Sequence, residues 1–483
     1  MKKITIIVIS LLLVAISLIG YTYWISSVAI QNLEKSEDAW SIDNWRPART
    51  ITYVDLESNQ MLHQDKLKWQ QPIPDYRDLG DRIWFLNPEN PEVFNYEMMP
   101  NYDLIIYGYR LHYESESMGT SHGFLIDANG RLWTWGSNVN GRTGRGIITG
   151  NTIVPTLVDT GDTTFIQVSA SSNYTIAIDS EGKLWSWGDS SNGRLGLGFM
   201  SGNVTIPTLV DTGDTRFINV SASGTNNTTV AHNLAVDTNG RIWSWGHNQF
   251  GQTGLGISSG ATWTPRLIQG VSTRFVKVKA AHLHSLAVDT QGKLWSWGSH
   301  EHGATGLDRE DNFSTVPQLA KSQLVTPVAI SAANRHNIVL DSQGVLWGWG
   351  ENLNGQTGLG LTSGNTSLPT KIETGANRFI DVSTSNRGSA AIDSEGNLWT
   401  WGTNEFGLNG NGTTTGHVLR PAKIEVDGVR FIRVFSASNG VIAIDTQGRL
   451  WGWGSNSTSR IGLGVAAGPY LTPTLNSVII PIL

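Results

Sequence analysis

Cysteine is absent from this chain of 483 residues. That absence excludes disulfide bonds, thiolate metal ligands, a cysteine nucleophile and a lipidated cysteine anchor. Charge is also sparse, because only 15% of the residues are charged, the formal net charge is −6, and no long basic run is present. Since nucleic-acid binding depends on a positively charged surface, we expect no nucleic-acid partner.

Catalytic signatures are scarce as well. The sequence contains no H-E-x-x-H motif and no Walker loop. The stretch GRTGRG at 141–146 is a variant of a glycine loop that recurs along the chain, so we do not interpret it as a phosphate cradle. We therefore expect a protein that is not an enzyme, with no cofactor and no bound metal.

What the sequence does contain is one pattern that recurs seven times. A W-x-W pair is preceded by Asp-x-x-Gly and followed by a glycine-rich loop and a proline. The pairs are spaced by 52 residues, apart from one step of 58, and they begin at Trp133, Trp185, Trp243, Trp295, Trp347, Trp399 and Trp451. Three markers that share one period predict a repeat architecture.

Each repeat reads as a set of short strands. In residues 165–188, FIQVSASSNYTIAIDSEGKLWSWG, the apolar runs are short, rich in β-branched and aromatic residues, and bounded by turn residues. Asp179–Gly182 fits a tight hairpin turn, and Trp185 and Trp187 are expected on one face of their strand. Four strands in each of seven units predict an all-β, seven-bladed β-propeller over residues 104–483.

The repeats resemble those of the regulator of chromosome condensation family, which implies the same propeller fold. The resemblance rests on the V-S-A-S, G-K-L-W-S-W-G and N-x-x-G-x-x-G-x-G segments. The loop at 407–412 is interpreted as a degraded copy of the glycine-rich loop. In the seventh repeat, Ser459 stands where this loop should have its first glycine. A histidine recurs before the turn aspartate, which suggests a structural role: His122, His232, His284 and His336, with Tyr174, Gly388 and Gly440 in the other blades.

The amino terminus indicates export. Residues 1–30 carry Lys2 and Lys3, and then no charged residue until Glu34. This pattern is typical of a bacterial signal peptide or signal anchor with its amino end inside. Both forms remain open, and we favour an uncleaved transmembrane helix through residues 4–24, with the propeller outside the cytoplasmic membrane, over cleavage and secretion.

Residues 31–103 are not repetitive and contain four tryptophans. They pack against the propeller or form a small domain of their own, and the sequence does not separate these two possibilities. Since the repeats account for the fold, function is sought where the repeat is broken.

The extra six residues of the 58-residue step lengthen a loop of blade 3. Because loops tolerate insertions and also carry binding sites, this insertion is a candidate contact element. Histidines of blade 4 and two aromatic loop tips are further candidates on the same face of the propeller. The candidate binding residues are Gly224, Thr225, Asn226, Asn227, Thr228, Thr229, Phe250, His282, His300, Glu301, His302 and Phe406.

Three functions remain open at this stage. The leading one is a monomeric, non-catalytic propeller that binds an unidentified protein or surface ligand through loops on one face. The family resemblance implies an alternative, a guanine-nucleotide exchange factor for a small GTPase. The third is an exported enzyme that acts on glycans. Fold alone does not choose among them.

Overall fold

The computed structural model describes two compact units, residues 1–112 and 113–483. Within them it describes residues 49–55, 61–67, 76–78, 83–85, 94–98, 104–108 and 116–478, apart from 199–201, 224–229, 322, 325, 363, 465–467 and 477. The segment predicted to anchor the chain, residues 4–24, lies outside this part. No helix in the described part is long and apolar enough to cross a membrane.

The described strands of the first unit form two small sheets. One sheet has the order β2-β1-β6-β5, with β1 and β6 parallel, and the other pairs β3 with β4. These strands are β1 (Arg49–Asp55), β2 (Met61–Leu67), β3 (Tyr76–Asp78), β4 (Ile83–Phe85), β5 (Phe94–Met98) and β6 (Leu104–Gly108).

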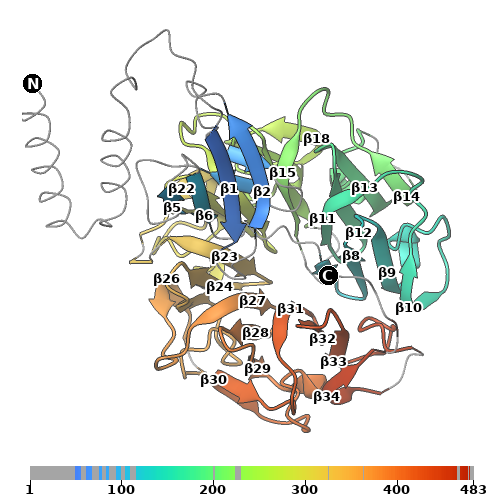
Figure 1. Ribbon diagram of the computed structural model, residues 1–483, viewed down its shortest axis with the longest axis vertical. Coiled ribbons are helices and arrows are strands. Elements are labelled where there is room, and N and C mark those ends of the chain that lie inside the picture. Colours follow the sequence, from blue (N-terminus) through green and yellow to red (C-terminus); the bar gives the residue numbers. More distant parts are fainter. Residues whose placement is uncertain are drawn as a thin grey trace, which may run out of the picture. The chain divides into compact units, whose positions relative to one another are not determined.

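The second unit is a seven-bladed β-propeller, as predicted, and each blade is an antiparallel sheet of four consecutive strands (Figure 1). Blades 1 to 3 consist of β7 (Glu116–Met118), β8 (His122–Ile126), β9 (Leu132–Ser137), β10 (Asn151–Leu157); β11 (Phe165–Ala170), β12 (Tyr174–Asp179), β13 (Leu184–Asp189), β14 (Asn203–Leu209); and β15 (Phe217–Ala222), β16 (His232–Asp237), β17 (Ile242–His247), β18 (Ala261–Leu267).

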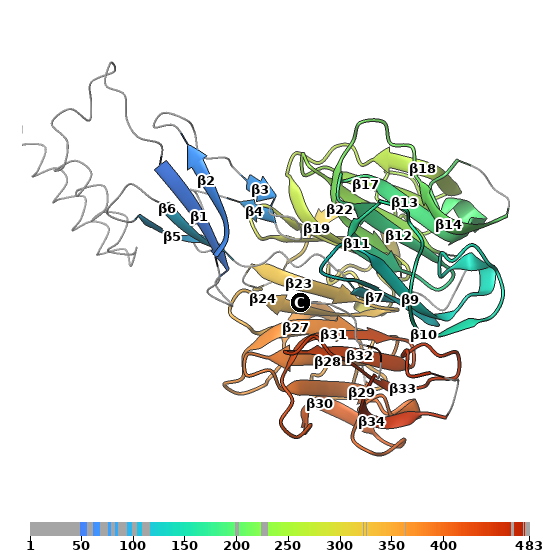
Figure 2. The same cartoon turned by 45° about the vertical axis from the view of Figure 1, so that its right-hand side comes forward.

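Blades 4 to 7 repeat this order. They consist of β19 (Phe275–Ala280), β20 (His284–Asp289), β21 (Leu294–Ser299), β22 (Phe313–Leu319); β23 (Pro327–Ala332), β24 (His336–Asp341), β25 (Leu346–Gly350), β26 (Thr366–Lys371); β27 (Phe379–Thr384), β28 (Gly388–Asp393), β29 (Leu398–Thr403), β30 (His417–Ile424); and β31 (Phe431–Ala437), β32 (Gly440–Asp445), β33 (Leu450–Gly454), β34 (Tyr470–Leu475). Figure 2 shows the strands of blade 6, β27 to β30, lying in sequence order.

The first strand of every blade lies on the inside of the ring, where it contacts the first strands of both neighbouring blades. The fourth strand is the outer one and carries the repeated proline, whose missing N–H does least harm at a sheet edge. In blade 2, Trp185 and Trp187 both pack toward Phe124 of blade 1, whereas Leu184 packs toward Trp245 of blade 3. The predicted alternation of the two faces is therefore confirmed.

The two tryptophans of each pair have different roles. The indole N–H of Trp185, the first of its pair, donates to Oδ2 of the turn aspartate Asp179 at 2.7 Å. The indole N–H of Trp187 instead donates to the backbone carbonyl of Arg142 in blade 1 at 2.9 Å. Every blade repeats both bonds, so the first tryptophan holds its own hairpin and the second joins its blade to the preceding one.

The recurring histidine also joins blades. His232 Nε2 lies 2.7 Å from Ser285 Oγ, and His284 Nε2 lies 2.8 Å from Asn337 Oδ1, in each case in the next blade. His122 and His336 make the equivalent contacts with Thr175 and Ser389. Tyr174, at the same position, donates through its hydroxyl group to Asn233 Oδ1. These side chains are buried at the blade interfaces, which agrees with a structural role.

The ring closes between blade 7 and blade 1 without exchange of strands, because all four strands of each blade come from one continuous segment. The Trp135 indole donates to the Arg460 carbonyl at 2.7 Å, and Leu125 packs with Ile442 and Ile461. The closing interface therefore has the same tryptophan bond as the other six interfaces.

One of the two glycine loops that were expected to be irregular is regular in the structure. The loop at 407–412 is not degraded, because Gly407, Gly410 and Gly412 have positive φ like their counterparts, and only the residues between them differ. The departure at Ser459 is real. Ser459 has φ 58°, is fully buried, and its hydroxyl group has no hydrogen-bond partner.

Replacing Ser459 by glycine is expected to stabilise the propeller by about 1 kcal/mol. The change removes a side chain from the left-handed region and a buried unpaired hydroxyl group, and these gains exceed the added flexibility of the unfolded chain. Chemical denaturation followed by tryptophan fluorescence measures the difference. An unchanged or lower midpoint for Ser459→Gly would contradict the assigned strain.

The interface histidines predict a loss of stability in mild acid. Burial lowers the pKa of His284 to about 4 and that of His336 to about 3, and it lowers the pKa values of His122 and His232 well below 6.5. The unfolded chain takes up protons below pH 6.5 whereas the folded chain does not, so stability falls as the pH decreases from 6.5. At pH 5.5 the loss is about 1 kcal/mol per histidine.

Urea denaturation at pH 7.5 and pH 5.5 tests this prediction in a range where the carboxylates stay ionised. A lower midpoint at pH 5.5 is expected. Equal midpoints at the two pH values would mean that these histidines are not held neutral at the interfaces.

Candidate partner-binding face

The two sides of the ring differ in their connections. Because successive strands run in opposite directions, the connections after the first and third strands of each blade lie on one side, here named the loop face. The short turns after the second strands and the connections between blades lie on the other side, named the turn face. All the described candidate binding residues lie on the loop face, and the other candidates, residues 224–229, lie outside the described part.

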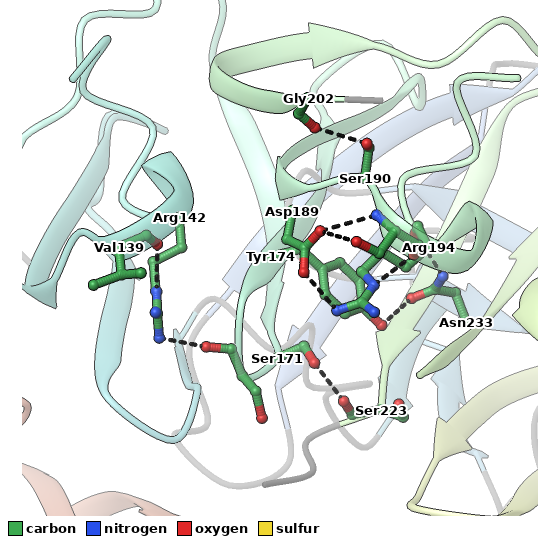
Figure 3. A network of polar contacts seen from close by, with 12 residues as sticks. Val139, Arg142, Ser171, Tyr174, Asp189, Ser190, Arg194, Gly202, Ser223 and Asn233 are labelled. Carbon is green, nitrogen blue, oxygen red and sulfur yellow. Dashed lines mark hydrogen bonds and ion pairs between the residues drawn. The ribbon is translucent and has the colours of Figure 1, made fainter. Parts of the chain in front are cut away.

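A buried polar network supports the loop face in blades 1 to 3 (Figure 3). The guanidinium group of Arg142 donates to the carbonyls of Val139 and Ser172, at 2.8 and 2.6 Å. Burial lowers the pKa of Arg142 to about 10, against the opposing effect of Asp189. Ser171 Oγ donates to the carbonyl of Ser223, the last described residue before the insertion, at 2.6 Å. The network therefore holds Ser223, the residue directly after β15, in place.

Arg194 is the centre of the second half of this network. Its side chain donates to Asp189 Oδ2 at 3.1 Å and to the Ser191 carbonyl at 2.7 Å, and its guanidinium carbon lies 5.7 Å from the centre of the Tyr174 ring. The carbonyl of Arg194 accepts from Asn233 Nδ2 at 2.8 Å. Burial raises the pKa of Tyr174 to about 12, so its hydroxyl group stays protonated. These groups act as a scaffold under the loops.

A second polar cluster spans blades 4 and 5, and Arg335 is its centre. The Arg335 guanidinium group lies 3.5 Å from Glu301 Oε1, 3.6 Å from Glu351 Oε1 and 3.1 Å from His302 Nε2. His302 also contacts Glu301 at 3.3 Å and Asn365 at 3.1 Å. We call Glu301, His302, Arg335, Glu351 and Asn365 the Arg335 cluster. The structure thus brings two candidate residues, Glu301 and His302, together.

The other candidates do not join this cluster. His300 is buried and holds its own loop, with Nδ1 2.6 Å from Thr305 Oγ1 and Nε2 3.0 Å from Ser314 Oγ. Asn352 has the same role one blade later. Phe250 is half-buried on blade 3, whereas Phe406 is 43% exposed on blade 6 and has φ 61°.

His282 differs from the interface histidines. Both of its ring nitrogens are buried and neither has a hydrogen-bond partner. The pKa of His282 is lowered to about 4, mainly by burial and to a smaller extent by the positive charge of Arg335. A neutral imidazole carries one donor and one acceptor, so His282 leaves two hydrogen-bonding groups unused beside Arg335. An unsatisfied buried group of this kind calls for an explanation beyond packing.

The described residues contain no group of three or more histidines, aspartates or glutamates that could hold a metal ion. Two G-x-S-x-G spacings occur, at 119–123 and 256–260, but their serines, Ser121 and Ser258, lie in connections between two strands. A nucleophile elbow requires a turn from a strand into a helix, which these connections do not provide.

Sequence reasoning missed Arg335, Glu351 and Asn365, as well as the buried Arg142 and Arg194. Arg335 and Glu351 occupy positions where most other blades carry uncharged residues, such as Leu283 and Ser299, although blade 6 has Arg387 and blade 2 has Asp189 there. A comparison of the blades position by position would have shown both. Their meeting with Glu301 depends on two blades being neighbours, which such a comparison does not reveal.

The fold and this face define the chain as a seven-bladed β-propeller repeat protein. A family model for the RCC1-like domain matches residues 110–429. The chain belongs to the RCC1-like domain family, and the family resemblance expected from the sequence is confirmed.

Two relatives match a similar length of this chain but differ widely in their own length. The ultraviolet-B receptor UVR8 of Arabidopsis thaliana is 28% identical over 354 residues, 72% of this chain and 78% of the receptor. The E3 ubiquitin-protein ligase HERC2 of Homo sapiens is 28% identical over 345 residues, 69% of this chain but only 7% of the ligase.

Solved structures support the fold alone. Human WBSCR16 superimposes with a TM-score of 0.64 at 20% identity, over 72% of this chain and 94% of that chain. Prp20p of Saccharomyces cerevisiae, described with its binding properties to Gsp1p and histones, has a TM-score of 0.62 at 18% identity, over 72% and 85% of the two chains.

The unsatisfied state of His282 generates a prediction about stability. Replacing His282 by leucine is expected to stabilise the propeller by about 1 kcal/mol, because it removes two buried polar atoms that have no partners. The matched change His284→Leu is expected to destabilise it by about 2 kcal/mol, because Asn337 Oδ1 is left buried without its partner.

Denaturant midpoints at pH 7.5 measure both effects. If the two substitutions destabilised the propeller equally, His282 would be a structural histidine like His284.

Proposed function

We propose that this protein is a non-catalytic binding propeller that recognises a protein partner through its loop face. The Arg335 cluster and the nearby His282 carry the proposal, because Arg335 and Glu301 are partly exposed and both ring nitrogens of His282 lack hydrogen-bond partners. Three exposed apolar side chains lie on the same face in blades 5 and 6: Leu353, Leu361 and Phe406, which are 60%, 58% and 43% exposed. Protein interfaces combine such apolar anchors with arginine.

The proposal includes display outside the cytoplasmic membrane. It rests on the apolar, lysine-headed segment of residues 1–30. An exchange factor for a small GTPase is the alternative that the family resemblance implies, and an exported glycan-active enzyme is the third. Location separates the first two, since a GTPase regulator acts in the cytosol, and assays on cell-wall glycans test the third.

Affinity capture tests the loop face. The full chain with a carboxy-terminal tag, in mild detergent, is exposed to the membrane and secreted proteins of the source cells. The variant Leu353→Ser, Phe406→Ser is expected to reduce the amount of captured partner about ten-fold, because each substitution removes an exposed apolar anchor. A second variant lacks residues 224–229 and tests the insertion.

The matched control is Leu209→Ser, Leu319→Ser, which changes two leucines of the outer strands that are 47% and 48% exposed. This control is expected to capture as much partner as the parent. Equal losses in both double variants, with the fold intact, would place the binding site away from the loop face.

A further inference from the structure

Charge is unevenly distributed over the loop face. In blades 1, 2 and 7 the loop-face connections contain four arginines, three of them buried, and the carboxylate beside them, Asp189 at the end of β13, pairs with Arg194. In blades 4 to 6 the connections are residues 281–283, 300–312, 333–335, 351–365, 385–387 and 404–416. They contain six carboxylates against three arginines: Glu301, Asp308, Glu310, Asp311, Glu351 and Glu405, with Arg309, Arg335 and Arg387.

Most of this charge is accessible to a partner. Asp308, Glu310 and Asp311 are exposed, and the side chains of Glu301 and Glu405 are 50% and 55% exposed. All three arginines already have partners, because Arg309 pairs with Asp311, Arg387 with Glu405, and Arg335 with Glu301 and Glu351. An excess of three carboxylates therefore remains on this part of the face.

The loop-face connections of blades 4 and 5 contact each other, and the blade 5 connection also contacts strand β30 of blade 6. Asn365 Nδ2 contacts His302 Nδ1 at 3.1 Å, which joins the end of the blade 5 loop to the blade 4 loop. Asn352 Nδ2 donates to the Leu361 carbonyl at 2.9 Å, which closes the blade 5 loop on itself. Gly355 of the same loop packs against Leu419 of blade 6. The apolar anchors therefore lie among the acidic loops.

The floor of this surface has unused hydrogen-bonding capacity. Neither nitrogen of His282 has a partner, and Arg335 Nε is also buried and unpaired. Unpaired buried groups are costly, so a polar group of a partner that reached them would stabilise the complex. This observation is independent of the carboxylate excess, and it also favours a bound partner on this part of the loop face.

From these features we infer that the loop face of blades 4 to 6 docks a polypeptide segment of the partner that carries both lysine or arginine and apolar residues. The inference rests on the proposed function and specifies the partner's chemistry. The basic side chains pair with the three carboxylates in excess, and the apolar ones cover Leu353, Leu361 and Phe406. A polar group of the segment meets His282.

Other occupants fit this surface less well. Nucleic acids and acidic proteins would be repelled by the excess of carboxylates. A second copy of this chain, related by a two-fold axis, would bring the same acidic loops together. Of the four loop-face arginines of blades 1, 2 and 7, Arg145 alone is exposed. A second copy that placed these blades over the acidic loops would therefore form few ion pairs.

Fluorescence anisotropy with two peptides tests the inference on the full chain. The first probe is a labelled 16-residue peptide with four repeats of Lys-Leu-Gly-Lys, and the second has Glu in place of Lys. The basic peptide is expected to bind the parent, and to bind more weakly as the salt concentration rises. The acidic peptide is expected not to bind.

Two triple variants of equal net charge locate the binding. Glu301→Gln, Glu310→Gln, Glu405→Gln changes exposed residues of the loop face and is expected to weaken basic-peptide binding about ten-fold. Glu181→Gln, Glu373→Gln, Glu395→Gln changes exposed residues of the turn face and is expected to leave it within about two-fold of the parent. Unchanged tryptophan fluorescence confirms that both variants are folded.

Three outcomes would overturn the inference: no binding of the basic peptide, stronger binding of the acidic one, or equal weakening by the two triple variants. The capture experiment distinguishes a failure of this inference from a failure of the proposed function. If the loop-face triple variant still captures the partner while Leu353→Ser, Phe406→Ser does not, the binding face stands and the basic partner is wrong. If both capture it fully, both proposals are wrong.

Discussion

The hydrogen bond from the second tryptophan of each pair to the preceding blade is the contact on which the propeller depends. In all seven blades a fully or almost fully buried indole donates to a loop carbonyl next door, as Trp297 does to Gln252 and Trp135 to Arg460. The bond fixes the glycine-rich loop of one blade on the third strand of the next. Every loop backbone is therefore held by its neighbour, whatever side chains it presents to solvent.

Because of that constraint, the residues that hold the loops and the residues that are available to a partner lie in different parts of each loop. Deep in the loops, Arg142, Arg194 and His300 satisfy backbone and side-chain groups and leave little for a partner. At the loop tips, His302 and Phe406 adopt positive φ, which is unfavourable for such side chains, and Phe406 is also exposed. The equivalent Asn140 and Asn192 share this conformation, so it belongs to the repeated loop. Variation at the tips is compatible with folding because the tryptophan bond already holds the backbone.

Much of the fold could be predicted from the sequence, because seven copies of one pattern leave little ambiguity about blade number, strand order and the face of each tryptophan. The Arg335 cluster could not, since Glu301, Arg335 and Glu351 meet only once two blades pack together. His300 was proposed for binding because of its residue type, yet it replaces the asparagine that holds other loops. The loop at 407–412 was misjudged because Asn409 and Asn411 obscured an intact glycine spacing. The membrane anchor and residues 224–229 remain predictions.

Hydrogen–deuterium exchange of the full chain, alone and with its captured partner, tests most directly whether the loop face binds. Binding there would slow exchange in the loop-face connections of blades 4 to 6, residues 300–312, 351–365 and 404–416, and leave the turns at 180–183 and 394–397 unchanged. Protection confined to those turns or to the outer strands would contradict a binding site on the loop face.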